Sequence, residues 1–504
     1  MKRLSAALAL ALSLAACGGD NPAPPPGGDG PPVGSPPPVD PPPANPPPVD
    51  PPPVDPPPVE PEFPDQLSAV LYYQNRCVKP EGSQRSGTLK DEFNFLRRWT
   101  DLTYLWNKEV PDIDASKYSS AVGYFNVLKT PLLTASGRPK DRFHFSYPNQ
   151  TWEELSRGVE MGYGITWVRN ADGTVPRTWR IAQLQPDAPA ALAGLRRGDQ
   201  LVLADGVDFI NSTDSASIGK LNAAIYPKNA DEPHRFEFRR GQETVKVALN
   251  SVPAVIAPVQ NVAVIDTADG RFGYLTFGNH NALAEKPLVD AFTRFRDEGV
   301  TELVLDLRYN GGGLLSLASQ VAYMIAGPEP TKGKVFERTL TNDPAKPGAP
   351  LLFTPTAGSG KALPYLGLKR VNILTGPGTC SASESIINGL RGVDVEVRLY
   401  GSQTCGKPYA FVPTRNCENT YFTIQYQGVN DKGFGDYGDG FAPSCRVADD
   451  LEHPLGSENE AVLAAALAGP ARCVPAAGAR AAAPAPGLVP VRPIGSEIAI
   501  HDRP

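Results

Sequence analysis

From residue 258 to about 470, stretches with the pattern of strands alternate with stretches with the pattern of helices. The strand-like stretches are rich in β-branched and apolar residues and include GRFGYLTF, ELVLDLR, VNILTG and VEVRLYG. Strands that alternate with helices build βαβ units around a mostly parallel sheet, and the sites of such sheets lie at the carboxyl ends of the strands. The pattern therefore predicts an α/β domain over 258–470 with its site at that edge.

Loops of unusual composition follow three of these strands. ELVLDLR leads to Tyr309-Asn310 and the triple glycine 311–313, VNILTG leads through a Gly-Pro-Gly turn to TCSASESII, and VEVRLYG leads to SQTCGK. Ser381 then stands at a strand-to-helix corner, where the positive end of the helix dipole favours developing negative charge. Ser381 and Glu384 also match a capping box, in which the carboxylate reaches back to the backbone N–H of the serine.

The three loops together predict a nucleophilic site. A serine hydroxyl attacks well only after a base takes its proton, and a lysine can be that base in its neutral form, which burial favours. Lys407 ends the third loop. The bare N–H groups of the glycine turn could bind an oxyanion. Ser381 and Lys407 are therefore predicted to form a Ser–Lys dyad, a known variant of the catalytic triad.

Two domains are predicted before the α/β domain. Residues 66–156 have apolar side chains at helical spacing, as in LKDEFNFLRRWTDLTYLW, and are expected to form a helical domain. Residues 157–252 are rich in short strands and resemble a PDZ domain of the bacterial protease type through GYGI (162–165), DAPA (187–190) and AGLRRGD (193–199). The resemblance implies that the N–H groups of Gly162, Tyr163, Gly164 and Ile165 bind the terminal carboxylate of a peptide, which adds as a strand to the sheet edge.

The amino terminus has the pattern of a lipoprotein. Met-Lys-Arg supplies a positive start, residues 4–16 are a short apolar signal peptide, and Leu14-Ala15-Ala16-Cys17 looks like a bacterial lipobox. Lipid would be added to Cys17, and the proline-rich residues 17–65 would act as a semi-rigid polyproline II spacer. Gly18 after the cysteine is similar to outer-membrane lipoproteins. We therefore expect a protein of the bacterial cell envelope, anchored in the outer membrane and facing the periplasm.

The composition argues against several partners and cofactors. The formal charge is −6 and no basic stripe interleaves with aromatic residues, so nucleic acid is not an expected partner. The five histidines are scattered and no CxxC pair occurs, so neither a metal nor another cofactor is expected. Residues 474–504, rich in Ala, Pro and Gly, are predicted to be disordered.

The chain has seven cysteines, and six remain when Cys17 carries the lipid. An even number in an exported chain suggests disulfides. Cys380 and Cys405 flank the predicted catalytic residues and are expected either to pair or to remain two free thiols. Cys417 and Cys445 bracket a hairpin-like region and are predicted to pair with each other.

The order of the motifs resembles the carboxy-terminal processing, or tail-specific, protease family. With the helical and PDZ-like domains, the resemblance covers residues 66–470. The motifs that carry it are Gly273-Tyr274-Leu275, Leu305–Gly313, Ser381-Ala382-Ser383-Glu384, Gly406-Lys407 and Tyr437–Pro443. The resemblance implies a multidomain protein with a ClpP/crotonase-like catalytic core. It also implies a membrane-anchored serine endopeptidase whose protein or peptide substrates are recognised by their carboxyl termini.

The resemblance also implies roles for individual residues. Ser381 would be the nucleophile and Lys407 the general base, while Glu384 would keep its capping role. The oxyanion hole would be formed by the N–H groups of Ala382 and of Gly312 or Gly313. This chain departs from the family in two ways. The spacing from Ser381 to Lys407 is about one residue longer than the common pattern, and the glutamine that many members carry one turn after the lysine is replaced near Phe411.

Two alternatives stay open. A related branch uses serine with histidine and glutamate, and His280 could supply that histidine, although a surface position is expected for it. The other alternative is an inactive, PDZ-bearing lipoprotein that binds carboxyl tails. The missing glutamine favours it, whereas the presence of both Ser381 and Lys407 opposes it. A cysteine protease based on Cys380 would lack a positioned histidine.

Overall fold

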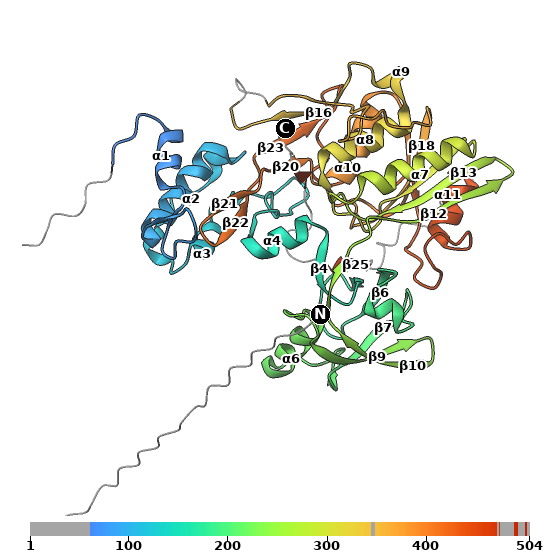
Figure 1. Cartoon of the computed structure of the whole chain (residues 1–504), viewed down its shortest axis with the longest axis horizontal. Helices are drawn as coiled ribbons and strands as arrows, with labels where there is room; N and C mark the ends of the chain where they lie inside the picture. The colour runs from blue at the N-terminus through green and yellow to red at the C-terminus, as the bar shows by residue number, and fades with distance from the viewer. Residues whose placement is uncertain (1–60, 344–347, 471–472, 474–487, 492–498, 501–504) are drawn as a thin grey trace, which may run out of the picture. The chain divides into compact units, whose positions relative to one another are not determined.

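The computed structural model of the chain describes residues 61–343, 348–470, 473, 488–491 and 499–500 (Figure 1). The signal peptide, Cys17 and the proline-rich spacer lie outside the described residues, as does most of the tail that is predicted to be disordered. Within the described ranges, every helix is too short or too polar to cross a membrane.

The first part of the described chain is mainly helical. α2 begins with a capping box, in which the N–H of Asp91 donates to Thr88 Oγ1 at 3.2 Å and the N–H of Thr88 donates to the Asp91 carboxylate at 2.7 Å. The aromatic side chains of α2 are buried against α1 and α3. The elements are α1 (Gln66–Tyr73), β1 (Arg76–Cys77), β2 (Arg85–Ser86), α2 (Leu89–Thr103), the 3-10 helices η1 (Asn107–Glu109) and η2 (Ala115–Lys117), α3 (Ala121–Phe125), β3 (Phe145–Pro148) and α4 (Asn149–Ser156).

A β-rich module follows. Its strands are ordered β10-β9-β7-β6-β5-β25, with β8 beside β7, while β4 and β11 pair as a separate ribbon. Trp167, Phe236 and Phe238 form the centre of its core. The elements are β4 (Val159–Gly162), β5 (Ile165–Arg169), β6 (Trp179–Leu184), α5 (Pro189–Leu192), β7 (Gln200–Ala204), β8 (Val207–Asp208), α6 (Ser215–Ile225), β9 (Pro233–Arg240), β10 (Glu243–Asn250) and β11 (Val252–Val255). The added strand, β25 (Val489–Val491), comes from the carboxyl-terminal segment.

The third part is an α/β domain. Its main sheet has the order β12-β13-β14-β18-β19-β24, in which β12 is antiparallel to β13 and the other pairs are parallel. The elements are β12 (Val259–Thr267), β13 (Gly270–Phe277), α7 (Glu285–Asp297), β14 (Glu302–Asp306), β15 (Gly313–Leu314), α8 (Leu315–Ala326), α9 (Pro328–Thr331), β16 (Val335–Leu340), β17 (Leu351–Leu352), β18 (Arg370–Thr375), α10 (Ala382–Gly392), β19 (Glu396–Gly401), β20 (Tyr409–Ala410), β21 (Thr414–Asn416), β22 (Asn419–Phe422), β23 (Tyr426–Val429), β24 (Cys445–Arg446), α11 (Ala461–Ala468) and, at the carboxyl end, β26 (Ala499–Ile500).

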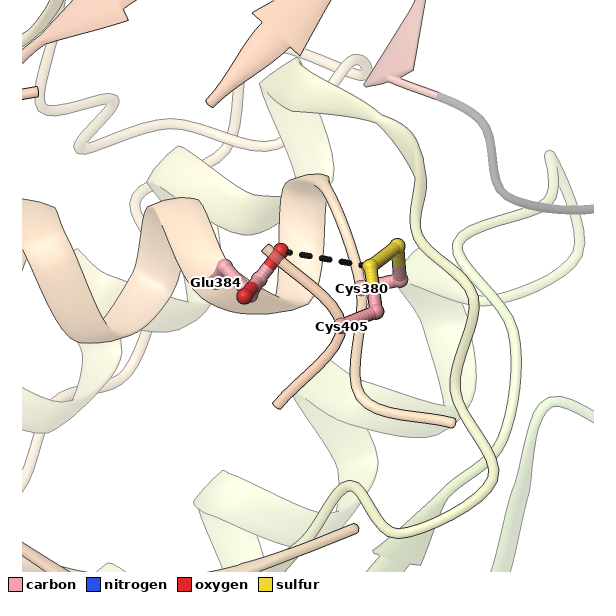
Figure 2. Close-up of side chains that lie close together, drawn as sticks. All are labelled: Cys380, Glu384 and Cys405. Atoms are coloured by element: carbon pink, nitrogen blue, oxygen red, sulfur yellow. Dashed lines mark hydrogen bonds between the residues drawn. A yellow bond between two sulfur atoms is a disulfide. The ribbon is translucent and has the colours of Figure 1, made fainter. Parts of the chain in front are cut away.

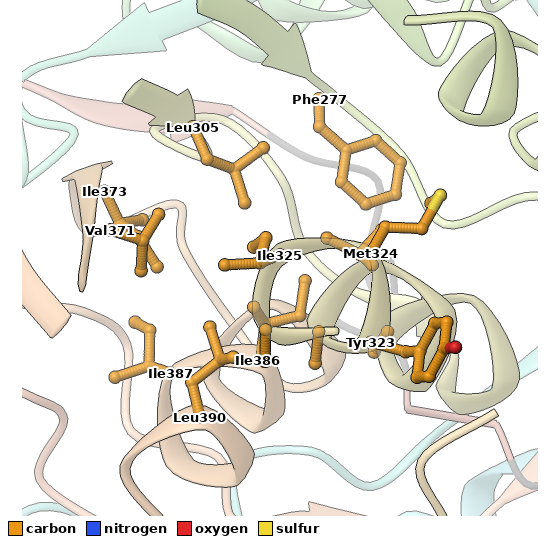
Figure 3. Packing of buried hydrophobic residues seen from close by; sticks show 14 of the residues in the cluster. Phe277, Leu305, Tyr323, Met324, Ile325, Val371, Ile373, Ile386, Ile387 and Leu390 are labelled. Atoms are coloured by element: carbon orange, nitrogen blue, oxygen red, sulfur yellow. The ribbon is translucent and has the colours of Figure 1, made fainter. Parts of the chain in front are cut away.

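Helices cover both faces of this sheet, because successive strand residues point to opposite sides. Leu303 and Leu305 of β14 pack with α7, α8 and α10, whereas Val304 packs on the other face with α11. Figure 3 shows Leu305 and two residues of β18 against Ile386, Ile387 and Leu390 of α10. The near-continuous apolar runs read from the sequence are those of strands buried on both faces.

The carboxyl ends of the four parallel strands β13, β14, β18 and β19 meet at one edge of the sheet. They lead to His280, to the triple glycine, to Ser381 and to Lys407, respectively. The structure therefore brings the three predicted loops together at the edge where α/β sheets place their sites.

Three disulfides join the six cysteines other than Cys17: Cys77–Cys417, Cys380–Cys405 and Cys445–Cys473. The predicted pair of Cys417 with Cys445 is wrong. Cys417 lies in the turn between β21 and β22, next to Cys77 of the helical part. Cys445 lies on β24 in the apolar cluster under α11, where it meets Cys473. Cys417 and Cys445 each pair with a cysteine that tertiary packing brings close, and not with each other across the hairpin.

Candidate active site

Ser381 stands at the junction between β18 and α10. Its backbone has φ 58° and ψ −117°, on the positive-φ side where residues other than glycine are rarely found. Such a conformation costs roughly 1–3 kcal/mol and persists only where the surrounding structure fixes it. The side chain is buried, and its Oγ has no hydrogen-bond partner within the described residues. A strained backbone and an unpaired buried hydroxyl at one residue indicate a functional position rather than a helix cap alone.

Glu384 connects Ser381 to the loop that carries Lys407. The N–H groups of Ser381 and Lys407 donate to the same carboxylate oxygen, Oε2, at 3.0 and 2.8 Å. The other oxygen, Oε1, accepts from the N–H of Gly406 at 2.9 Å and from the Thr404 hydroxyl. Burial raises the pKa of the Glu384 carboxyl, and these donors act in the opposite direction by stabilising the carboxylate. Glu384 thus reaches back to the N–H of Ser381, as a capping box predicts, and also holds the neighbouring loop.

Lys407 is buried beside two aromatic rings. The residue is 1% exposed, and its Nζ lies 4.3 Å from the ring centroid of Phe411 and 4.8 Å from that of Phe143. A cation over the faces of aromatic rings is attracted to them. Phe411 is the residue near the position where the glutamine is expected, so an aromatic ring lies beside the amine there. Ser381 Oγ has no partner among the described residues, so its hydroxyl is not hydrogen-bonded to Lys407.

The segment before β3 reaches this loop from far away in the sequence. Phe143 lies in it, and the neighbouring Arg142 donates to the carbonyl of Cys405, 263 positions along the chain, at 2.7 Å. Arg138 pairs with Asp439 on the other side of the loop. The sequence reasoning missed Phe143 and Arg142, because no local pattern marks a residue whose contact is made so far along the chain.

Figure 2 shows the disulfide between Cys380 and Cys405 beside Glu384. The bridge joins the residue before Ser381 to the residue two before Lys407, and its Cα atoms are 5.2 Å apart. Of the two states predicted for these cysteines, the disulfide is the observed one. The possible ligand atoms of Cys380, Glu384 and Cys405 lie close enough together to bind one metal ion. The disulfide, however, uses both thiols, and cysteine binds a metal as a thiolate.

The triple glycine lies against the start of α10, since the carbonyl of Asn310 accepts from the N–H of Cys380 at 3.1 Å. The N–H of Gly312 donates to Asn310 Oδ1 at 2.9 Å, so this amide is already engaged. Gly313 has φ 137°, and a Cβ there would come within 2.5 Å of the carbonyl oxygen of His280. Of the two glycine amides predicted for the oxyanion hole, that of Gly312 is therefore bound to Asn310.

His280 is buried behind the triple glycine, and the expected surface position is wrong. Its Nδ1 lies 3.0 Å from Asn310 Oδ1, and its own N–H donates to the carbonyl of Gly312 at 3.2 Å. Burial lowers the pKa of His280 to about 4, so the ring is neutral at pH 7. Its Nε2 has no partner in the part of the chain that is described, and neither does Ser381 Oγ, so the two are not bonded to each other.

The motif Tyr437–Pro443 interlocks with the loop before Lys407. The N–H of Thr404 donates to the carbonyl of Phe441 at 3.1 Å, and the N–H of Phe441 donates to Thr404 Oγ1 at 2.7 Å. Gly406 has φ 85°, and a Cβ there would come within 2.4 Å of the carbonyl oxygen of Gly438. Glycine is required at 406 because any side chain would separate the two loops.

The predicted carboxylate-binding loop lies between β4 and β5. Gly162, Tyr163, Gly164 and Ile165 all line a cavity of about 50 Å³, together with Ile225 and Tyr226 at the end of α6. Gly164 has φ 75°, and a Cβ there would lie 2.2 Å from that of Ala188. The loop can therefore keep this shape only with glycine at 164.

Two family models match the chain. The model of the peptidase S41 N-terminal domain matches residues 94–147, and that of peptidase family S41 matches residues 271–430, which include the triple glycine, Ser381 and Lys407. The matched catalytic part of the chain, residues 271–430, belongs to peptidase family S41. This S41 member is therefore an enzyme, a serine-type peptidase.

Curated relatives of this S41 peptidase are carboxyl-terminal-processing enzymes. It is 25% identical over 364 residues to the chloroplastic carboxyl-terminal-processing peptidase 1 of Arabidopsis thaliana, an alignment that covers 68% of each chain. It is 28% identical over 243 residues to the carboxyl-terminal-processing protease of a Synechocystis strain, covering 46% of this chain and 50% of that one. The match to the corresponding Picosynechococcus protease covers 44% of this chain and 49% of that one at 25% identity. The chain thus spans about half the length of the two cyanobacterial relatives.

A solved structure shares the fold. An S41 protease from Bacteroides fragilis superposes with a TM-score of 0.58 at 22% identity, covering 74% of this chain and 96% of that one. The multidomain α/β architecture of this S41 peptidase is therefore one already seen in its family.

A second buried carboxyl, Glu337 on β16, makes the stability of this S41 peptidase depend on pH. Its oxygen accepts from the Ser385 hydroxyl of α10 at 2.7 Å. Burial raises the pKa of Glu337 from 4.5 to about 7, so the folded chain holds this proton more tightly than the unfolded chain. The stabilisation is complete below pH 4.5 and is lost as the pH rises through about 7.

We expect the free energy of unfolding of the wild type to fall, relative to that of Glu337→Gln, as the pH rises from 5 to 8. The glutamine imitates the neutral acid, so the difference between the two proteins should change by up to about 3 kcal/mol. Urea unfolding at a series of pH values measures this change. Parallel pH profiles for the two proteins would show that Glu337 does not titrate in this range.

Proposed function

We propose that this S41 peptidase is an endopeptidase that cleaves peptide bonds with a Ser381–Lys407 dyad. One observation carries the proposal: the backbone N–H groups of Ser381 and Lys407 donate to a single oxygen of Glu384. A buried carboxylate that accepts from both residues fixes the nucleophile and the base relative to each other. The Ser381 hydroxyl, which has no partner within the described part of the chain, is consistent with a site whose hydrogen bonds tighten only when substrate is bound.

The chemistry follows from these positions. The neutral amine of Lys407 takes the proton of Ser381 Oγ while Oγ bonds to the carbonyl carbon of the substrate. The oxyanion that forms accepts hydrogen bonds from the N–H of Ala382, at the start of α10, and from that of Gly313. Lys407 then returns the proton to the leaving amine, which leaves an acyl-serine. Water attacks this ester by the same route in reverse, and the serine is restored.

A second arrangement uses His280 as the base. It is favoured by the buried, neutral ring of His280, whose Nε2 has no hydrogen-bond partner among the described residues. Asn310, rather than a carboxylate, contacts the other ring nitrogen, so the triad would lack its acidic member. Cleavage of a protein with an apolar carboxyl tail, followed by mass spectrometry of the products, tests the endopeptidase proposal. Internal cuts by the wild type and none by Lys407→Ala support the lysine dyad, whereas internal cuts by both proteins favour His280.

The β-rich module is proposed to be a PDZ domain that binds the carboxyl tails of substrates. The loop Gly162–Ile165 precedes β5, lines a cavity and keeps a shape that requires glycine at 164. Backbone N–H groups in such a loop can bind a terminal carboxylate while the peptide adds to the sheet edge.

We expect a peptide with a free, apolar carboxyl terminus to bind about tenfold or more tightly than its amidated form. Amidation removes the negative charge and one hydrogen-bond acceptor. The bound peptide therefore loses a hydrogen bond to a charged group. Fluorescence anisotropy of labelled peptides on Ser381→Ala protein measures both affinities without cleavage. As a control, Gly164→Ala, checked for folding by circular dichroism, should bind both peptides equally weakly. Equal affinities of the free and amidated peptides for the protein with Gly164 would show that the loop does not recognise the carboxylate.

Lipid attachment at Cys17 is proposed from the lipobox-like sequence, with the chain held at the outer membrane and facing the periplasm. Cys17→Ser should move the protein from the membrane fraction to the soluble periplasmic fraction or stop its processing. Fractionation together with the mass of the mature amino terminus measures the change. An unlipidated wild-type chain that still fractionates with membranes would contradict the proposal.

A further inference from the structure

The carboxyl-terminal segment of the chain occupies the free edge of the β-rich module. β25 pairs antiparallel with β5, with Val489 opposite Arg169 and Val491 opposite Trp167. The other edge of β5 is taken by β6. β25 is therefore the strand that an added peptide would otherwise supply.

The direction of β25 matches that of a bound carboxyl tail. β5 begins at Ile165, the last residue of the loop Gly162–Ile165, and ends at Arg169. Because the pairing is antiparallel, the chain advances along β25 from a position opposite Arg169 towards that loop. A substrate tail that presents its carboxylate to the loop must run the same way.

Side chains of the segment pack on both the module and the α/β domain. Val491 packs against the core of the module. Leu488 packs against the cluster of Val168 and Leu451, and so does Tyr309, the residue just before Asn310 and the triple glycine. Pro490 has no N–H to donate, which an edge strand tolerates. Val489 and Pro490 also line a cavity of about 820 Å³ that borders Cys405 and Arg142.

The last described strand reaches the active site itself. β26 pairs in parallel with β15, with Ala499 beside Gly313 and Ile500 beside Leu314. It also lies next to β20, which begins two residues after Lys407. The backbone of residues 499–500 therefore runs between the glycine strand and the strand that follows the base, where a substrate backbone would meet the oxyanion donors.

We propose that the carboxyl-terminal segment is an internal ligand of this enzyme, which competes with substrate at the β5 edge and at the strand of Gly313. The proposal rests on the proposed function, because it takes the β5 edge and the Gly313 strand as the places where substrate binds. A segment tethered to its own site is present at high effective concentration, so it needs only weak contacts to compete. The substrate class that displaces it is an extended, apolar carboxyl tail.

Truncation after Gly487 tests the proposal in the otherwise complete chain. If the segment occupies its site in about nine-tenths of the molecules, its removal lowers KM for a tail-bearing peptide about tenfold and leaves kcat unchanged. A synthetic peptide of residues 488–500, added to the truncated enzyme, should raise KM again as a competitive inhibitor, and a scrambled peptide should not. In the full chain, Val491→Asp should imitate the truncation, while Ala481→Asp, at a position that precedes Leu488 in the sequence, should not.

The outcomes separate this inference from the proposed function. An unchanged KM after truncation, with no inhibition by the 488–500 peptide, overturns the internal ligand. A loss of kcat on truncation also overturns it, because the segment would then be part of the folded site. The preference for a free over an amidated substrate is measured on the same truncated enzyme. If that preference is absent while truncation still lowers KM, the proposed recognition of carboxylates is contradicted and the internal ligand is supported.

Discussion

Ser381→Ala and Lys407→Ala should each lower kcat/KM for peptide cleavage by about 10³-fold or more, the scale seen when a member of a catalytic unit is removed. Without Oγ no acyl-serine can form, and without the Lys407 amine nothing takes its proton. The thermal midpoint of Ser381→Ala should stay near that of the wild type, because among the described residues its Oγ makes no hydrogen bond that the substitution would remove. Steady-state kinetics with a fluorogenic peptide and a thermal melt measure both quantities.

Matched controls separate the dyad from general damage. Ser402→Ala changes a serine in the same loop as Lys407, and Lys432→Ala removes an exposed lysine that pairs with Asp394. Both should retain wild-type kcat/KM. His280→Ala distinguishes the two candidate bases. Near wild-type turnover by Lys407→Ala together with a large loss in His280→Ala would contradict the lysine dyad.

Removing the Cys380–Cys405 disulfide by alanine at both positions should lower kcat by about 10–100-fold and the free energy of unfolding by about 3–4 kcal/mol. The bridge ties the residue before Ser381 to the loop of Lys407, so its loss lets the two loops separate. The hydrogen bonds of Glu384 still connect them, which is why some activity should remain.

The Cys445–Cys473 bridge supplies the control. It closes a loop of similar length, with a sequence separation of 28 against 25, but lies in the apolar cluster under α11. Its removal should cost comparable stability and leave kcat unchanged. Kinetics and urea unfolding on both double variants measure the comparison. Equal losses of kcat in the two variants would mean that the active-site bridge acts through stability alone.

The positions of Ser381 and Lys407 could be predicted because each is encoded locally. Both follow apolar strands of a βαβ pattern, and the carboxyl ends of parallel strands meet at one edge. Glu384 could be predicted for the same reason, since capping is a relation between residues three positions apart. The capping pattern does not predict the other contacts of Glu384. Its carboxylate also accepts from the N–H groups of Gly406 and Lys407, which lie in the loop across the sheet edge.

Features that depend on long-range packing could not be predicted from local sequence patterns. Phe143 meets Lys407 from the helical part of the chain, and Cys77 pairs with Cys417 across a separation of 340 residues. The burial of His280 follows from the triple glycine folding over it, not from the sequence around it. The tail, judged by composition alone, gave no sign that residues 488–491 pair with β5. In each case the partner is set by the tertiary fold.

Covalent labelling tests the central claim most directly. A fluorophosphonate probe that reacts with activated serine hydroxyls should modify the wild-type chain once, on the tryptic peptide that contains Ser381, as located by tandem mass spectrometry. Labelling should disappear in Ser381→Ala and fall steeply in Lys407→Ala, while His280→Ala should be labelled like the wild type. Modification of a different serine, or labelling of Ser381 that is independent of Lys407, would contradict the proposed dyad.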